Sequence, residues 1–193
     1  INMAQSDEAA HASTLISAIS QINADVVFMR HALAPGFGDP SNFQLDDCNT
    51  QRNLDEKGRE LAKSIGRELQ NSDIQFSEIL SSEWCRCKET ASLLEIGKWE
   101  TFSGLNSFFQ DYVDKGETLK SLRLKLSDLE EGVNLMITHQ VVIRAITGSS
   151  SRSGEFVAFN TKTKSKNFFS IISFTISVIL SLTLFTIISF SSS

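Results

Sequence analysis

Short apolar runs that end abruptly in polar residues are the main pattern along this chain. Val26–Met29 is too short for a typical helix, and its β-branched and aromatic residues suit a strand buried on both faces. Phe76–Leu80 and Val133–Ile137 repeat the pattern further along, and Glu155–Phe159 indicates a late strand. These runs predict the strands of one buried sheet.

Amphipathic segments alternate with the expected strands. Leu61, Ile65 and Leu69 fall on one face of a helix that we expect Asn53 to cap, with Glu56 in its first turn. The other segments with helical character are residues 13–22, 84–94, 119–129 and 140–146. Because strands and helices alternate, the predicted fold class is α/β, a three-layer α/β/α domain with a mostly parallel central sheet.

Cationic and imidazole side chains follow three of the expected strands. Arg30 and His31 end the first strand, Arg86 comes shortly after the second, and His139 follows the third. The carboxyl ends of parallel strands share one edge of the sheet, where open α/β sheets bind ligands. We therefore expect two histidines and two arginines to meet in one crevice, although each could alone be an ordinary surface or core residue.

Net charge and composition limit the classes of ligand that this crevice could bind. The 193 residues carry a net charge of −5, which argues against a nucleic-acid binder and requires local cations to hold any anion. No Asp or Glu stands beside His31 or His139, and nearby guanidinium groups would oppose a metal ion, so no metal is expected. Phosphate fits better, because arginine binds its oxygens in pairs and a neutral imidazole can attack phosphorus.

Four short motifs, in this order, resemble the histidine phosphatase superfamily, branch 1, whose fold is phosphoglycerate mutase-like. Met29–His31 reads M-R-H where that family has R-H-G, and Asn53–Gly58 reads N-L-D-E-K-G. Ser81–Ala91 reads S-S-E-W-C-R-C-K-E-T-A, and Thr138–His139 supplies the second histidine. The resemblance covers about residues 26–159.

The resemblance implies a metal-independent phosphatase, a phosphomonoesterase of the histidine acid phosphatase type, with no cofactor. It implies that His31 is the nucleophile and that Arg30 and Arg86 hold the phosphoryl oxygens. His139 would stabilise their charge, and Arg52 resembles an arginine that lines the substrate pocket. The implied partner is a small phosphorylated substrate or a phosphoprotein.

One position departs from the family pattern. Leu105–Asn106–Ser107 stands where the family commonly has Leu-Asn-Glu, and serine cannot protonate a leaving alcohol with a useful pKa. Asp111 or Asp114 could substitute for the missing acid. Two alternatives therefore stay open: a catalytically weak protein that binds phosphorylated ligands, and a phosphotransferase of the phosphoglycerate mutase type.

The cysteines bear on the cellular compartment. The three cysteines form no C-x-x-C pair and no disulfide framework. The stretches A-P-G-F-G-D-P and D-C-N-T-Q-R-N-L resemble an often exported subgroup of the family, which implies an exported or periplasmic protein. In that case a disulfide from Cys48 to Cys85 or Cys87 is expected.

The two ends of the chain are expected to lie outside the catalytic domain. We expect an N-terminal extension over residues 1–24, the phosphatase domain over 25–160 and an apolar, Ser/Thr-rich tail over 161–193. Residues 168–190 contain no charged side chain and are long enough to cross a bilayer. Lysines precede them, so a membrane anchor would leave the domain cytoplasmic, in conflict with export. The alternative is an end with no native role.

Overall fold

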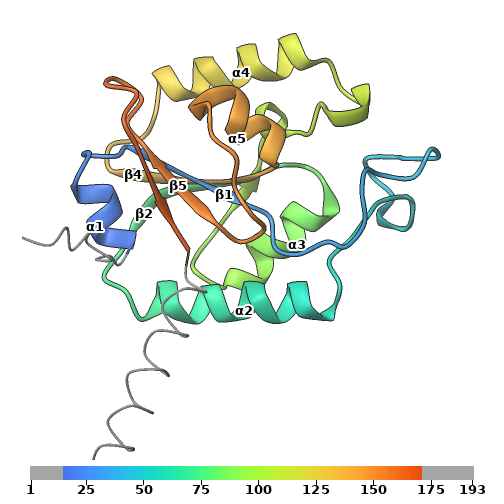
Figure 1. Ribbon diagram of the computed structural model, residues 1–193, viewed down its shortest axis with the longest axis horizontal. Helices are drawn as coiled ribbons and strands as arrows, with labels where there is room; N and C mark the ends of the chain where they lie inside the picture. The colour runs from blue at the N-terminus through green and yellow to red at the C-terminus, as the bar shows by residue number, and fades with distance from the viewer. Residues whose placement is uncertain (1–14, 171–193) are drawn as a thin grey trace, which may run out of the picture.

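The computed structural model describes residues 15–170, which form a mixed sheet between two layers of helices (Figure 1). The strands are β1 Val26–Arg30, β2 Phe76–Ser81, β3 Glu100–Thr101, β4 Val133–Thr138, β5 Phe156–Phe159 and β6 Lys166–Phe169. The helices are α1 Leu15–Ser20, α2 Glu56–Gln70, α3 Cys85–Leu94, α4 Lys115–Ser127 and α5 Gln140–Thr147. The predicted three-layer α/β/α class is confirmed.

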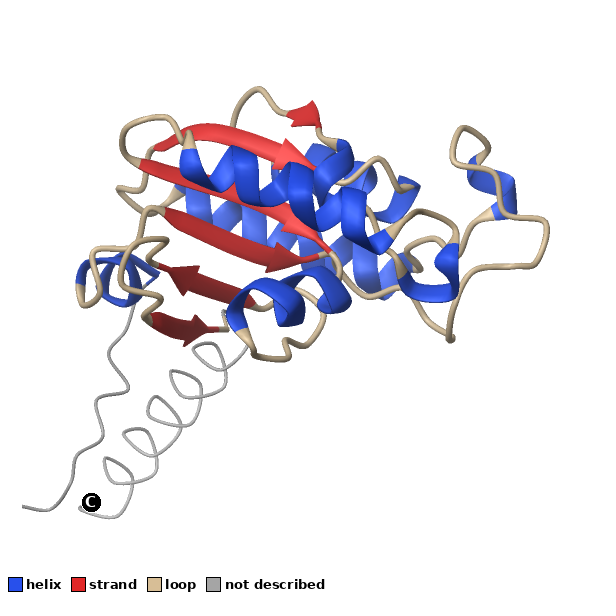
Figure 2. Ribbon diagram, turned by 90° about the horizontal axis from the view of Figure 1, so that it is seen from above, coloured by secondary structure: helices blue, strands red, loops and turns tan. Residues whose placement is uncertain are grey.

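The sheet has the order β3-β2-β4-β1-β5-β6 (Figure 2). The first four strands in the chain run parallel, and β5 runs antiparallel to β1. Arg30 is paired with Thr138, and Ser81 with Ile137, so β1, β4 and β2 end side by side. The predicted convergence of these three strand ends is confirmed.

Alternating side chains of the central strands form a core on each face of the sheet. Val27 and Met29 pack toward α1, α2 and α3, whereas Val26 and Phe28 pack toward α4 and α5. All four side chains are fully buried. This burial on both faces explains why β1 reads as a continuous apolar run rather than as an alternating one.

The N-cap of helix α2 lies two residues later in the chain than expected. Asp55, not Asn53, is the N-cap, because its carboxylate accepts the Gly58 N–H at 2.7 Å. Asn53 instead donates its side-chain amide to the Cys48 carbonyl. A Cβ on Gly58 would lie 1.9 Å from the Leu33 carbonyl oxygen, so only glycine lets α2 pack this closely against the loop that follows β1.

The long loop between β1 and α2 is held by packing and by a covalent bond. Phe43 stacks on Trp84 with ring centroids 4.9 Å apart and on Tyr112 at 4.4 Å. Cys48, in a short 3-10 helix of the loop, is bonded to Cys85 at the start of α3. Of the two pairings expected for Cys48, the structure has this one, and Cys87 is free and buried.

The described fold extends past residue 160, where we expected the tail to begin. Strand β6 pairs with β5, and Phe169 packs on Phe156 with ring centroids 6.3 Å apart. Within residues 15–170 no helix is long and apolar enough to cross a membrane. The expected span over 168–190 begins in β6 and otherwise lies outside the described residues.

Candidate active site

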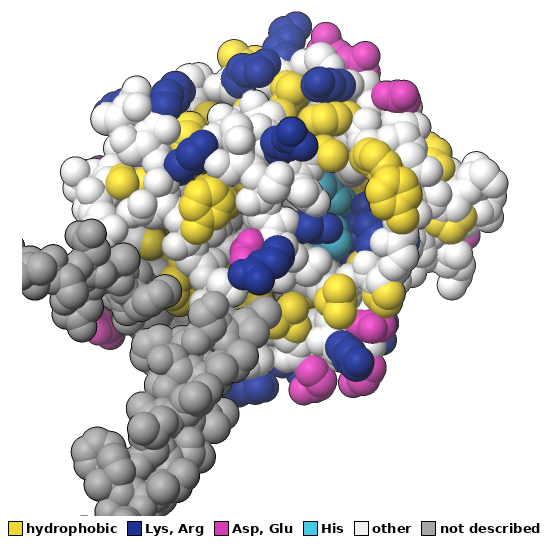
Figure 3. All heavy atoms as spheres, viewed as in Figure 1, with side chains coloured by type: hydrophobic (Ala, Val, Ile, Leu, Met, Phe, Trp, Pro, Cys, Tyr) yellow, Lys and Arg dark blue, Asp and Glu magenta, His cyan; other side chains and the backbone are white. Residues whose placement is uncertain are grey.

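A cavity of about 170 Å³ opens at the carboxyl edge of the sheet. All five residues expected at the site line it, although they come from four separate segments of the chain. In Figure 3 histidine and arginine side chains are visible inside a hollow of the surface. The complete lining is Arg30, His31, Gly36, Phe37, Gly38, Asp39, Arg52, Arg86, Ser107, Phe109, His139, Gln140 and Val141.

The backbone fixes the tautomer of His31. Its N–H extends the β1–β4 ladder to the Thr138 carbonyl at 3.0 Å, so the residue is held at the strand end. The ring Nδ1 lies 2.7 Å from the Ala32 carbonyl, and because a carbonyl only accepts, Nδ1 must carry the hydrogen. Burial first, and then the charge of Arg86, hold the pKa of His31 well below its ordinary value. The imidazole is therefore neutral, and the lone pair lies on Nε2.

His139 has the opposite hydrogen placement. Its Nδ1 lies 3.4 Å from Nη2 of Arg86, which can only donate, so Nδ1 accepts. Nε2 therefore carries the hydrogen and donates to Ser82 Oγ at 2.9 Å, and Ser82 donates onward to Asn106 Oδ1 at 3.1 Å. Burial, followed by the charge of Arg86, lowers the pKa of His139 well below its ordinary value. The ring centroids of His139 and His31 are 5.4 Å apart.

Each of the three arginines is anchored to the protein on one side. Arg30 donates Nη1 to the Ser151 carbonyl at 2.8 Å, and Arg52 donates Nε to the Gly38 carbonyl at 2.9 Å. The pKa values of Arg30 and Arg52 are lowered by burial and then by the charge of Arg86. Nε of Arg30 and Nε of Arg86 are buried and have no hydrogen-bond partner. An unpaired buried donor is costly to the folded protein.

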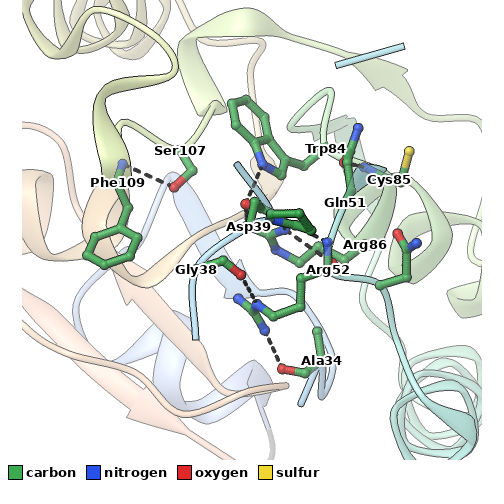
Figure 4. A network of polar contacts seen from close by, with 12 residues as sticks. Ala34, Gly38, Asp39, Gln51, Arg52, Trp84, Cys85, Arg86, Ser107 and Phe109 are labelled. Carbon is green, nitrogen blue, oxygen red and sulfur yellow. Dashed lines mark hydrogen bonds and ion pairs between the residues drawn. The ribbon is translucent and has the colours of Figure 1, made fainter. Parts of the chain in front are cut away.

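Asp39 is a central residue of the site that the sequence did not indicate (Figure 4). Its Oδ1 accepts from Arg86 Nη1 at 2.7 Å and from the Arg52 N–H at 2.9 Å. Its Oδ2 accepts from Arg86 Nη2 and from Trp84 Nε1, both at 3.1 Å. Burial would raise the pKa of Asp39, but the hydrogen bonds and charge of Arg86 hold it below its usual range. With four donors around it, the carboxylate positions Arg86 and has no proton to give.

The charges around the cavity match a phosphate dianion. Three guanidinium cations and the Asp39 carboxylate leave two positive charges, since both imidazoles are neutral. A phosphate monoester carries nearly two negative charges at pH 7. In the described part of the chain, no group of three His, Cys, Asp or Glu side chains is placed to hold a metal ion.

The candidates for a general acid are not brought together by the fold. Ser107 lines the cavity, and its hydroxyl accepts the Phe109 N–H at 3.3 Å. Asp111 and Asp114 do not line the cavity, and Asp114 instead caps α4 by accepting the Glu117 N–H at 2.7 Å. We therefore find no free carboxylic acid among the described residues of the lining.

Cys87 lies close to the site but is chemically unreactive. Its sulfur is 3.4 Å from Nε2 of His139. Burial raises the pKa of the Cys87 thiol to about 12, so the nucleophilic thiolate is not populated near neutral pH. Among the described cysteines, Cys48 and Cys85 are bonded to each other. The Cys87 thiol is therefore not a candidate nucleophile of the site.

Comparison with known proteins gives matches in structure alone. No protein-family model matches the chain, and no curated protein matches its sequence. A structure from Agrobacterium tumefaciens, described as the phosphohistidine phosphatase SixA, is 18% identical with a TM-score of 0.52, covering 76% of this chain and 98% of that one. One from Escherichia coli, described as an alpha-ribazole-5'-P phosphatase, is 15% identical with a TM-score of 0.53, covering 75% and 94%.

A third similar structure holds a phosphorylated ligand. It is a mutant of phosphoserine phosphatase from Entamoeba histolytica in complex with phosphoserine, 12% identical, with a TM-score of 0.51, covering 75% of this chain and 94% of that one. At these identities the similarity establishes the fold. The described chain therefore has the phosphoglycerate mutase-like fold of the histidine phosphatases, as the resemblance of its motifs implied.

Proposed function

We propose that this protein is a metal-independent phosphatase, a phosphomonoesterase that works through a phosphohistidine at His31. The observation that carries the proposal is the tautomer of His31. Its Nδ1–H is held by the Ala32 carbonyl, which leaves an unprotonated Nε2 on a residue that lines a cavity with three arginines. An imidazole in this form is a nucleophile ready to attack phosphorus.

The reaction has two steps. In the first, the Nε2 lone pair of His31 forms a bond to phosphorus while the bond to the leaving group breaks, and the leaving group takes that electron pair. In the second, water attacks the phosphohistidine, the electron pair returns to Nε2, and the water's proton passes to solvent. Inorganic phosphate is then released. Neither step requires a proton from Nδ1.

The cations stabilise the transferring group. Arg30 and Arg86 line the cavity, and guanidinium groups suit phosphoryl oxygens. Arg52 adds a third charge, while Asp39 holds Arg86 in place. His139 accepts weakly from Arg86 in the unliganded form, and a bound phosphoryl oxygen would favour a proton on its Nδ1. The electrostatic contribution of one such donor is about 3–4 kcal/mol in known enzymes.

The proposed substrate class follows from the phosphatases that are similar in structure. The similar structures are described as phosphatases of phosphohistidine, of alpha-ribazole-5'-P and of phosphoserine. We accordingly propose a phosphorylated small molecule or a phosphorylated protein side chain as the substrate. Export from the cytoplasm is part of the proposal, because the Cys48–Cys85 disulfide suits an oxidising compartment.

A second candidate function has one specific observation in its favour. Ser107 replaces the expected acid, and Asp39, the carboxylate of the lining, is fully engaged by donors. A protein with this pocket could bind phosphorylated ligands tightly and turn them over slowly or not at all. The two candidates differ in turnover and agree in phosphate binding.

Phosphate release from p-nitrophenyl phosphate in excess EDTA tests the proposal. We expect wild type to release phosphate and His31→Ala to lose at least about 10³-fold in kcat/KM, because the nucleophile is gone. Quenching with detergent at alkaline pH, with substrate labelled in the phosphoryl group, should trap a phosphoenzyme in wild type and none in His31→Ala, because phosphohistidine is stable in alkali and hydrolyses in acid. His11→Ala is the matched control, since this histidine lies outside the described residues and has no place in the proposal.

Three outcomes would count against the phosphatase. Release that EDTA abolishes would contradict the metal-independent mechanism. Unchanged turnover in His31→Ala would remove the proposed nucleophile. Phosphate binding by wild type without any turnover would support the binding protein instead.

A further inference from the structure

Two exposed phenylalanines border the cavity on the side away from the core. Phe37 is 89% exposed and Phe109 is 37% exposed, and both line the same cavity as His31. Their ring centroids are 5.0 Å apart and the ring planes meet at 82°, an edge-to-face contact. Figure 3 shows apolar side chains bordering the hollow in which histidine and arginine appear.

The position of the pair argues against an ordinary role in the core. Phe37 lies between Gly36 and Gly38, which have φ values of +94° and +70°, so the chain turns tightly on both sides of the ring. Phe109 comes from a different segment, which follows the cavity residue Ser107. Two loops that are far apart in the sequence thus bring solvent-exposed aromatic rings into contact beside a charged pocket.

The cavity lining has two chemically different parts. Arginine and histidine side chains of the lining suit a phosphoryl group, whereas Phe37, Phe109 and Val141 add apolar surface to the same cavity. A ligand that matches both kinds of lining has an anionic head and a flat apolar body. Aromatic rings pack well against such a pair in edge-to-face or offset geometry.

The missing general acid points to the same class of ligand. Asp39 is the carboxylate among the described lining residues, and its four acceptor positions are filled. Without a proton donor, the leaving group must depart as a weak base. A phenolate meets this condition, and so does an imidazole whose other ring nitrogen is already protonated, whereas the alkoxide of an ordinary alcohol does not.

We propose that Phe37 and Phe109 form a subsite for an aromatic ring bonded directly to the phosphoryl group, so that the substrates are aryl phosphates or N-phosphoryl imidazoles. This inference rests on the proposed phosphatase activity. In the first step the bond from phosphorus to the aryl oxygen or ring nitrogen breaks, and the ring keeps the electron pair. The new bond joins phosphorus to Nε2 of His31.

Steady-state kinetics with three substrates test the subsite: p-nitrophenyl phosphate, phosphoimidazole and glycerol 2-phosphate. Wild type should prefer the two aromatic substrates by at least about 100-fold in kcat/KM, the typical contribution of a general acid that the alkyl ester lacks here. The double variant Phe37→Ala/Phe109→Ala should raise KM for the aromatic substrates by about 10-fold. The inhibition constant of inorganic phosphate should stay unchanged, because phosphate has no ring.

Two further variants separate aromatic recognition from general effects. Phe37→Leu/Phe109→Leu keeps apolar volume and removes the flat rings. Its KM for the aromatic substrates should rise nearly as much as that of the double alanine variant. Phe168→Ala is the matched control, because Phe168 is 50% exposed on β6 and lies outside the cavity lining. Equal thermal midpoints of all variants would show that they remain folded.

The possible outcomes separate the inference from the proposed function. If phosphate inhibits wild type and His31→Ala is inactive, but the double alanine variant treats aryl and alkyl esters as wild type does, the subsite is refuted and the phosphatase stands. If the leucine variant has the same KM values as wild type, apolar volume alone binds the substrate ring, and the aromatic subsite is again refuted. If phosphate neither binds nor is released, both proposals fail together.

A phosphotyrosine peptide then distinguishes two sources of the same chemistry. If the natural ligand is a protein side chain, the peptide should be hydrolysed with a higher kcat/KM than free phosphotyrosine. Equal values for the two would assign the subsite to small aromatic phosphates. In either case the double alanine variant should lose about 10-fold of its preference for aromatic substrates.

Discussion

Reduction of the Cys48–Cys85 disulfide offers a quantitative test of how the loop between β1 and α2 is held. The bond joins residues separated by 37 positions and closes a loop that contains Arg52. Asp39 lies nine residues before Cys48, outside the closed loop but in the same connection between β1 and α2. Opening it gives the unfolded chain back the entropy that the cross-link removes. The chain-entropy relation for a closed loop of this length gives a loss of about 4 kcal/mol in the free energy of unfolding at 25 °C.

The folded protein should survive this loss with a lower melting temperature. Native domains are stable by about 5–15 kcal/mol, so most of the molecules remain folded at 25 °C after reduction. Each kcal/mol shifts the midpoint of a domain of this size by about 2–4 °C, so the midpoint should fall by roughly 8–16 °C. Gln51 still accepts the Cys85 N–H at 2.9 Å, and Phe43 still stacks on Trp84, so the loop keeps other contacts.

The catalytic site should respond along with the stability. A looser loop places the Asp39 carboxylate less firmly on Arg86, so kcat/KM should fall on reduction even at temperatures well below the new midpoint. Thermal unfolding and phosphate release, each measured with and without a phosphine reductant, follow the two effects. Thiol titration of the denatured protein should give one free thiol before reduction and three after it.

Cysteine variants serve as the controls for this test. Cys48→Ser/Cys85→Ser should have the lowered midpoint from the start, and reductant should not change it further. Cys87→Ser keeps the disulfide and should lose as much on reduction as wild type does. Three free thiols in the unreduced protein, or a midpoint that reductant leaves unchanged, would refute the reasoning.

Three further predictions concern charge and the edge of the sheet. Asp39→Asn should lower the free energy of unfolding in urea by about 3 kcal/mol and also reduce kcat/KM, because a buried guanidinium loses its partner; unchanged stability would contradict this. Because the pKa values of His31 and His139 are lowered in the folded protein, the two rings become protonated in the unfolded chain at a higher pH than in the folded one. The free energy of unfolding should therefore be highest above pH ~6.5 and fall on acidification by at most about 1.4 kcal/mol per pH unit for each ring. His31→Gln or His139→Gln should weaken this pH dependence, measured by urea unfolding at a series of pH values. Deletion of residues 161–193 should lower the thermal midpoint relative to deletion of residues 171–193, because the shorter chain lacks β6; equal midpoints would show that β6 contributes nothing.

The central strands could be predicted from the sequence because they are buried on both faces. Val26–Met29 and Val133–Ile137 give continuous apolar signals that few other structures produce, and each lies within one residue of the observed strand. Strands at the edges give no such signal. Glu100–Thr101 is exposed at both residues, and Lys166–Phe169 alternates between exposed and half-buried positions, so neither stands out from a loop or a tail.

The site was predictable where a residue sits at the end of a strand and unpredictable where loop packing decides. His31 and His139 follow strands whose direction the alternation of elements already implies, so their meeting could be expected. Asp39 reaches Arg86 across 47 positions, and that contact depends on how the loop folds over α3. The same holds for Phe37 and Phe109, whose contact joins two irregular segments.

The hydrogen bond between His31 and the Ala32 carbonyl has a consequence for mutagenesis. Many enzymes set the tautomer of a catalytic histidine with a carboxylate side chain, and replacing that side chain reveals its role. Here the acceptor belongs to the main chain, so it persists whatever side chain occupies position 32. An alanine scan would therefore detect His31, the proposed nucleophile, and overlook the carbonyl that sets its tautomer. Replacing the Ala32 carbonyl by chemical synthesis, for example with a thioamide at that peptide bond, is the direct way to weaken that acceptor.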